Sequence, residues 1–194
     1  TLSGSVDTFH TGPEGADLRR FLKYTEEKER REYWENRMAR DLPGVTLTDL
    51  QSVQPATFDK PIEFHLKLTA AQYAHVAGPL LLVRPRVVGT DAERIDDKQR
   101  TVPIDLGASG KWHDSYTIAL PAGWTVDETP DPTDIDTDFA SYHSKFTASG
   151  GELRYEREYV VREVEIPAAR VAEFRKLETA ILADEKGTAV LKKQ

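Results

Sequence analysis

Ile62-Glu63-Phe64-His65-Leu66-Lys67-Leu68 is the stretch that decides the fold, because apolar and polar side chains alternate along its whole length. Successive side chains of a β-strand point to opposite faces of the sheet. A period of two therefore predicts a strand with one face buried and the other face in water.

Further short strands are expected on the C-terminal side of this stretch. The residues Ser149-Gly150-Gly151 stand between two alternating segments and predict a hairpin. Leu80–Val88 is a more continuous apolar run and predicts a central strand, with an edge or a bulge near Pro85. The other expected strands are Thr101–Leu106, Ser115–Leu120, Trp124–Glu128, Ser141–Ala148 and Glu152–Val164. Several short strands separated by turn residues indicate a β-sandwich or a related antiparallel layer.

Helices are expected at both ends of the chain. Pro13 and Glu14 are typical of a first helical turn, and an apolar stripe follows them to Leu22. A second helix is expected from Glu26 to Leu42 and a third over Ala168–Asp184, each with apolar residues at three-to-four spacing.

These elements together predict an α+β fold that is predominantly β. The expected architecture is an antiparallel β-sandwich with an N-terminal strand plus two-helix segment and a C-terminal amphipathic helix. We divide the chain into residues 1–78, which contain the strand, the two helices and the first strands, and residues 79–194. The first part packs on the sandwich or is continuous with it, and the second part is the sandwich-like domain that ends in the helix.

Composition excludes several kinds of function. The 194 residues contain no cysteine, which removes disulfides, thiolate metal sites and a thiol nucleophile. The net charge is −7 without a concentrated basic stripe, which argues against nucleic-acid binding. No apolar run approaches the roughly 20 residues that a membrane-spanning helix needs. The sequence begins with Thr1, has no signal peptide, and is expected to be a mature product or a piece of a longer protein.

The chain shows no recognisable catalytic motif. Its five histidines are scattered, although His113 and His143 flank expected strands and could meet in the fold. Signatures of serine nucleophiles, phosphate-binding loops and dinucleotide-binding loops are missing. We therefore predict no enzyme activity, and no catalytic, cofactor-binding or metal-binding residue.

Two weaker patterns remain open. Asp134, Asp136 and Asp138 have the spacing that begins a helical calcium loop, but Phe139 stands where glycine is needed and Lys145 where glutamate is needed. A solvated loop is the preferred interpretation, and calcium binding stays an alternative. The aromatic side chains that could form a sugar-stacking platform are Trp112, Trp124, Tyr116 and Tyr142, although core packing is more common for such residues.

A resemblance appears over the last two-thirds of the chain. Leu82-Val83-Arg84-Pro85 leads, after a variable loop, to Arg100-Thr101-Val102-Pro103, then to Leu120-Pro121-Ala122-Gly123-Trp124. The Gly150–Leu153 hairpin, Ile166-Pro167-Ala168 and the terminal Val190-Leu191-Lys192-Lys193 complete the succession. This order resembles the C-terminal region of bacterial multidomain transglutaminase-like proteins. The Gly12–Arg19 helix start resembles, more loosely, the segment after their catalytic core.

The resemblance implies a function that does not include the family's catalytic step. The family's catalytic cysteine, histidine and aspartate belong to a central domain, and this chain offers no cysteine to match. The implied role is a non-catalytic accessory domain that packs on a catalytic domain missing from this fragment, or presents substrate to it. The implied partner is the upstream transglutaminase-like domain, with a protein or an envelope polymer as a further partner, and the implied location is extracytoplasmic. Arg84, Arg100 and Pro103 match recurring positions, for which a structural role is preferred. The alternative function is a carbohydrate-binding or cell-envelope-binding module.

Overall fold

The computed structural model describes the 194 residues except residues 40, 43, 55, 58, 72 and 88–99. Its first part holds the expected N-terminal strand and the two expected helices. In chain order the elements are β1 (Leu2–His10), α1 (Gly12–Tyr24), α2 (Glu27–Ala39), β2 (Val45–Val53), β3 (Ile62–Ala70) and β4 (His75–Ala77). The second helix is shorter than expected and ends at Ala39 rather than at Leu42.

The second part is mostly strand and ends with the expected helix. Its elements are β5 (Leu80–Val83), β6 (Ile104–Asp105), β7 (Gly110–Ala119), β8 (Trp124–Glu128), β9 (Asp134–Asp136), β10 (Ala140–Ser149), β11 (Glu152–Val161), β12 (Glu165–Ile166), a 3₁₀ turn (Ala168–Arg170), α3 (Val171–Glu185) and β13 (Ala189–Lys193). The prediction of a predominantly β, antiparallel α+β fold is confirmed.

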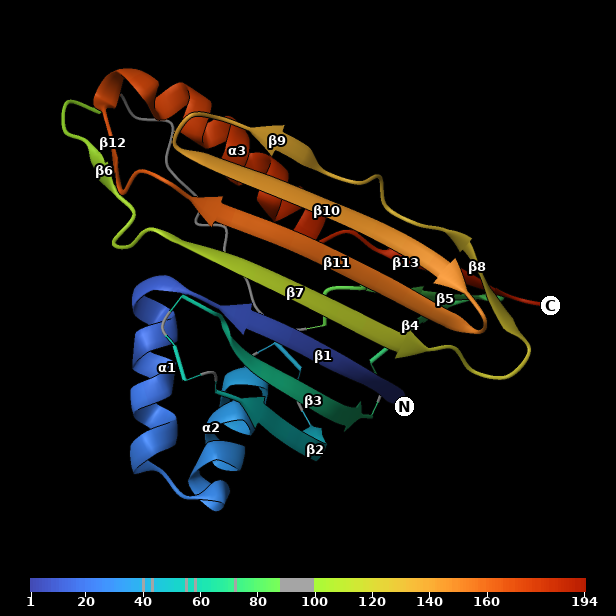
Figure 1. Ribbon diagram of the computed structural model, residues 1–194. Helices are drawn as coiled ribbons and strands as arrows, with labels where there is room; N and C mark the ends of the chain where they lie inside the picture. The colour runs from blue at the N-terminus through green and yellow to red at the C-terminus, as the bar shows by residue number, and fades with distance from the viewer. Residues whose placement is uncertain (40, 43, 55, 58, 72, 88–99) are drawn as a thin grey trace.

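A seven-stranded antiparallel sheet dominates the molecule (Figure 1). Its strand order is β2-β3-β1-β7-β11-β10-β9. The first strand, β1, lies in the middle and pairs with β3 on one side and with β7 on the other. Strands from both parts of the chain therefore form one continuous sheet, and the pairing crosses residue 78.

The two faces of this sheet differ in burial. Ile62, Phe64, Leu66 and Leu68 of β3 are at most 2% exposed, whereas the side chains between them reach solvent. The same alternation runs along β1 and β11. We call the buried side the covered face and the other side the open face. The alternation that begins at Ile62 thus predicted the strand and its half-buried character correctly.

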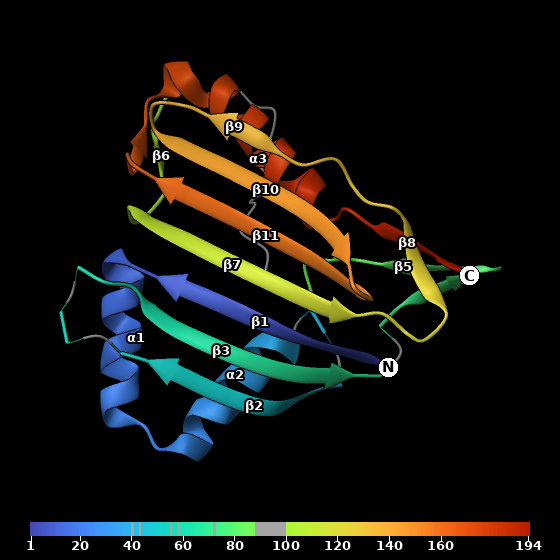
Figure 2. The same ribbon diagram turned by 45° about the vertical axis from the view of Figure 1, so that its right-hand side comes forward.

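Three sets of helices and strands pack on the covered face of the large sheet. Helices α1 and α2 pack on the β1–β3 end through Leu18, Leu22, Trp34 and Met38. A four-stranded sheet of order β4-β5-β13-β8 contributes to the same cluster. Helix α3 packs on β10 and β11 in a second cluster, and it lies behind these strands in both views (Figures 1 and 2). The layer opposite the large sheet is thus part helix and part sheet.

The Ser149-Gly150-Gly151 hairpin is confirmed. Strands β10 and β11 pair from Ser149↔Glu152 to Ala140↔Val161, with Gly150 and Gly151 at the turn. Their φ angles are 59° and 79°. Two consecutive positive φ values are typical of the turn whose twist matches a two-residue hairpin, and glycine adopts them without steric cost.

Several boundaries were predicted wrongly. Leu80–Val88 does not form one long strand, because β5 ends at Val83, just before Arg84-Pro85. This strand lies in the four-stranded sheet. Val88 is outside the described residues. A proline removes a backbone donor, which ends the pairing there. Of Thr101–Leu106 only Ile104–Asp105 is strand. The acidic segment 131–138 contains a short edge strand rather than only a loop. In the part of the chain that is described, no helix is both long and apolar enough to span a membrane.

Candidate functional site

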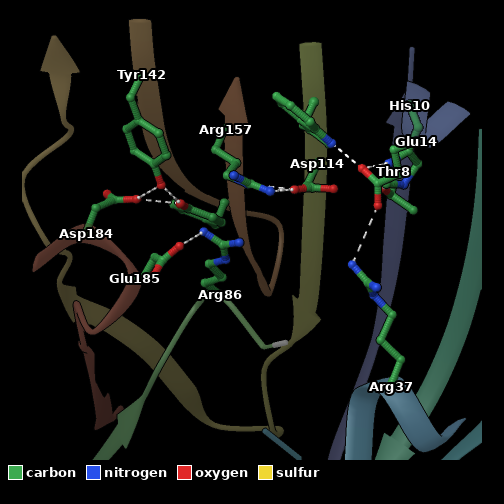
Figure 3. A network of polar contacts seen from close by, with 12 residues as sticks. Thr8, His10, Glu14, Arg37, Arg86, Asp114, Tyr142, Arg157, Asp184 and Glu185 are labelled. Atoms are coloured by element: carbon green, nitrogen blue, oxygen red, sulfur yellow. Dashed lines mark hydrogen bonds and ion pairs between the residues drawn. The ribbon is translucent and has the colours of Figure 1, made fainter. Parts of the chain in front are cut away.

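A buried carboxylate joins the end of α3 to the large sheet. Asp184 accepts hydrogen bonds from the hydroxyls of Tyr142, Ser144 and Tyr155, at 2.7, 2.6 and 2.5 Å. All four residues are buried. Figure 3 shows Tyr142 and Asp184 pointing toward each other. Three donors compensate for much of the hydration that the carboxylate loses on burial.

Two buried ion pairs lie beside this carboxylate. Arg86 donates to Glu185 at 2.5 Å, and both side chains are at most 2% exposed. Nε of Arg157 on β11 donates to Asp114 on β7 at 2.6 Å, in a pair at most 8% exposed. Figure 3 shows the second pair between the Asp184 group and a further polar group on β1. Opposite charges this deeply buried must stay together, because separating them leaves an unsolvated charge.

Burial also fixes the protonation of the two tyrosines. Loss of hydration raises the pKa values of Tyr142 and Tyr155 far above their ordinary range, and the nearby Asp184 carboxylate adds to the effect. Both hydroxyls therefore stay protonated and remain donors. Because Tyr142, Tyr155 and Asp184 are all buried, the two hydroxyls serve to hold α3 against the sheet.

Beyond the Arg157–Asp114 pair, Glu14 in the first turn of α1 is surrounded by several donors. Its Oε2 atom accepts from the indole N–H of Trp112 and lies 3.2 Å from Nδ1 of His10. Arg37 of α2 lies 3.8 Å from its other oxygen. Burial raises the pKa of Glu14, but the hydrogen bonds and charges of His10, Trp112 and Arg37 outweigh it, so the pKa lies below its usual value. Glu14 is therefore an ionised carboxylate that holds Trp112.

Trp112 is held in two further ways. Its ring stacks on Tyr159 of β11, with 5.7 Å between centroids and 29° between planes. The ring also folds back along β7 over Gly110, where an added Cβ would lie 2.9 Å from the indole. Only a residue without a side chain leaves room for this ring position. A hydrogen bond, a stacked ring and a glycine together fix the orientation of Trp112.

A cavity opens beside Trp112. Its volume is about 460 Å³, and it lies between the start of α1, the end of β11 and helix α3. Volumes of this size are typical of small-molecule sites. The described residues that line it are Glu14, Arg100, Ile104, Asp105, Leu106, Ala108, Trp112, Tyr159, Val161, Phe174 and Glu178. The cavity combines a fixed aromatic wall, an apolar part and several charged groups, which is the composition expected of a binding site.

The structure separates the four aromatic residues that could have formed a sugar-stacking platform. Tyr116 and Tyr142 are 3% and 0% exposed and belong to the two core clusters, so they offer no ring face. Trp124 is partly buried against the first cluster. Trp112 alone among the four lines the cavity. Position along the strand explains the difference between Trp112 and Tyr116, because both lie on the covered face of β7 but Trp112 is near the start of the strand and Tyr116 is nearer its middle.

The three aspartates of the suspected calcium loop each have a basic side chain beside them. Asp134 pairs with His143 at 2.6 Å, Asp136 with Arg162 at 3.1 Å and Asp138 with Arg170 at 3.4 Å. Within the residues that the structure describes, no group of three His, Asp or Glu side chains is placed to hold a metal ion.

The two histidines that could have met in the fold, His113 and His143, lie on the open face. Glu158 of β11 stands opposite both His113 of β7 and His143 of β10, so one strand separates the histidines. They share a shallow depression with Lys145 and Glu156, which form an ion pair at 2.5 Å. The charges of this row are paired with each other, as is common on solvated sheet surfaces.

The arginines singled out by the resemblance lie in different places. Arg100 is exposed and lines the cavity. Arg84 is partly buried; it donates to the carbonyl of Val87 at 3.5 Å, and its own carbonyl accepts from Tyr73 at 2.5 Å. Pro103 is exposed beside β6.

Sequence reasoning missed Glu14 and Tyr159 as neighbours of Trp112. Glu14 was assigned only to the helix start, and it meets Trp112 from 98 positions away. The one local signal is glycine at position 110, two residues before the tryptophan and hence on the same side of the strand.

The comparisons with known proteins give one match. A family model, described as a domain of unknown function with a solved structure and named DUF3858, matches residues 81–191. No curated protein and no solved structure shows significant similarity to the chain.

Proposed function

Since the chain belongs to the DUF3858 family, whose model covers more than half of it, we propose a function from its cavity and its motifs. The chain is a non-catalytic accessory domain of a bacterial transglutaminase-like protein. It holds a ligand or substrate for a catalytic domain that lies outside these residues. The observation that carries this proposal is the cavity at Trp112, whose aromatic wall is fixed before any ligand arrives.

The link to transglutaminase-like proteins rests on the order of the sequence motifs. These motifs run from Leu80 to Lys193 and coincide with the segment that the family model matches. A thiol nucleophile would have to come from another part of the polypeptide, because these residues contain no cysteine. The same resemblance favours an extracytoplasmic location, which fractionation of the source cells tests directly.

The test uses the full reading frame and the purified chain. We expect an upstream domain with a Cys, His and Asp core in the frame, and no hydrolysis of peptide or amide substrates by the 194 residues alone. With the full-length protein, Trp112→Ala is expected to raise KM for the natural substrate more than it lowers kcat, because the residue acts in binding. A thiol-independent peptidase or amidase activity in the purified chain contradicts the proposal.

A second candidate function is a carbohydrate-binding or envelope-polymer-binding module. It is favoured by the position of Trp112 in the cavity, because indole rings stack on sugar rings. Binding to glycan arrays or to isolated peptidoglycan should then disappear in Trp112→Ala. Tyr24→Ala is the matched control, because Tyr24 is an aromatic side chain that is 72% exposed and outside the cavity. Absence of binding at millimolar ligand contradicts this candidate.

A further inference from the structure

We propose that the cavity beside Trp112 binds an organic cation, an ammonium or guanidinium group carried on an apolar stem. This inference rests on the proposed function only in taking the chain as a binding module. It concerns the chemistry of the ligand, which neither the family match nor the sequence motifs address.

The charges around the cavity are mainly negative. Three carboxylates, those of Glu14, Asp105 and Glu178, line it from α1, β6 and α3, against the single guanidinium of Arg100 among the described lining residues. Glu178 is only 6% exposed. A partly enclosed site in which one sign of charge predominates attracts ligands of the opposite sign.

Existing partners leave acceptor capacity at Asp105. This carboxylate accepts from the backbone N–H of Gly107 at 2.7 Å. Glu14 already has His10, Trp112 and Arg37 as partners, and Glu178 is engaged within the protein. A carboxylate has about four acceptor positions, so one backbone donor does not exhaust that of Asp105. A ligand donor can therefore be added at Asp105 without displacing this contact.

The uncharged part of the lining suits such a ligand. The rings of Trp112 and Tyr159 line the cavity, and indole is the strongest aromatic partner for a cation. Ile104, Leu106 and Phe174 offer apolar surface for a stem of several methylene groups. An anionic ligand would face three carboxylates.

The experiment compares three five-carbon probes whose head groups are positive, neutral and negative. n-Pentylammonium, n-pentanol and n-pentanoate are titrated into the ¹⁵N-labelled chain, and the indole N–H resonance of Trp112 is followed. That resonance is assigned by its loss in Trp112→Phe. We expect a saturable shift with n-pentylammonium, and binding at least tenfold weaker with the alcohol and the carboxylate. Equal binding of the three probes, or no shift with n-pentylammonium, overturns the proposal.

Charge variants sharpen the test. Arg100→Glu removes the rim cation and should strengthen binding of n-pentylammonium roughly two- to fivefold. Lys193→Glu makes the same charge change near the C-terminus, at the opposite end of the molecule from β6, and should have no effect (Figure 1). Glu178→Gln should weaken binding about tenfold. If that buried variant does not fold, Asp105→Asn, at an exposed position, should weaken it roughly twofold or more. Unchanged affinity in Arg100→Glu contradicts the proposal.

The outcomes distinguish this inference from the proposed function. If oligosaccharides of N-acetylglucosamine shift the Trp112 resonance and n-pentylammonium does not, the cation proposal is wrong and the carbohydrate candidate gains support. If the purified chain hydrolyses amides without a thiol, the accessory function is wrong, whatever the probes show. A cation-selective shift in an inactive chain supports both.

Discussion

The covered face and the open face of the large sheet use the same kinds of ion pair in opposite surroundings. Arg86 follows β5 of the four-stranded sheet and Glu185 ends α3, so this pair belongs to the layer over the covered face, and it is at most 2% exposed. The Lys145 side chain of the Lys145–Glu156 pair is 67% exposed. Their N–O distances are equal, at 2.5 Å. Water screens the exposed pair and hydrates its members when they separate, but it cannot do so for the buried pair. Contact distance therefore says little about how much a pair matters, and burial decides it.

The largest effect should follow from breaking the buried pair. Arg86→Met leaves Glu185 charged and enclosed, and we expect a loss of about 3–5 kcal/mol in the free energy of unfolding. Urea denaturation followed by circular dichroism measures it. The double variant Arg86→Met/Glu185→Leu should recover much of the loss, because it removes both charges. A loss below about 1 kcal/mol in the single variant would show that the pair is solvated like those on the open face.

A smaller loss in the free energy of unfolding is expected from changing Asp184, the buried carboxylate that accepts from three hydroxyls. Asp184→Asn keeps one acceptor oxygen but turns the other into a donor, which faces hydroxyls that already donate. We expect about 2–3 kcal/mol less stability. Asp134→Asn is the matched control on the open face, where the side chain is 85% exposed, and it should change stability by less than about 0.5 kcal/mol. Equal effects of the two changes would remove the distinction between the faces.

Alkaline pH should act through the covered face. Tyr142 and Tyr155 have pKa values raised by burial, so their stabilising effect is fully present below their ordinary pKa of 10.0. Above this pH the unfolded chain loses protons that the folded chain keeps. The free energy of unfolding should then fall by about 1.4 kcal/mol per pH unit for each tyrosine. Stability of Tyr142→Phe measured between pH 9 and 11 should fall less steeply than that of the parent chain. An identical slope would mean that Tyr142 is accessible to water.

The smallest effect should come from the open face. Lys145→Ala removes the hydrogen bond that, together with the charge of Arg154, keeps the pKa of Glu156 below its usual value. We expect a change of about 0–1 kcal/mol in the free energy of unfolding, and less at 0.5 M salt. Thermal unfolding at two salt concentrations measures this. A loss comparable to that of Arg86→Met would contradict the comparison of the two faces.

Much of the fold could be predicted because its signals are local. The alternation from Ile62 to Leu68, the two glycines after Ser149 and the apolar spacing of the last helix each depend on a few neighbouring residues. Strand pairing over long distances has no such signal. The position of β1 between β3 and β7 could not be read from the sequence, and neither could the end of β5 at Val83.

The candidate cavity was harder to predict for the same reason. Glu14, Trp112 and Glu178 come from three elements that meet only in the folded chain. Tyr116 and Tyr142 were suspected of lining a binding surface because they are aromatic, and the sequence does not show how deeply each side chain lies.

The central position of β1 has a consequence for how the molecule assembles. Gly4 pairs with Ile118, so the middle of the sheet closes only after more than one hundred further residues have been made by the ribosome. Until then β1 can pair with β3 alone, and the edge that later receives β7 stays open to other chains. Such non-local pairing slows folding, because a long loop must be ordered before its contacts form. The newly made chain therefore passes through a stage with half a sheet, and that stage is its most aggregation-prone one.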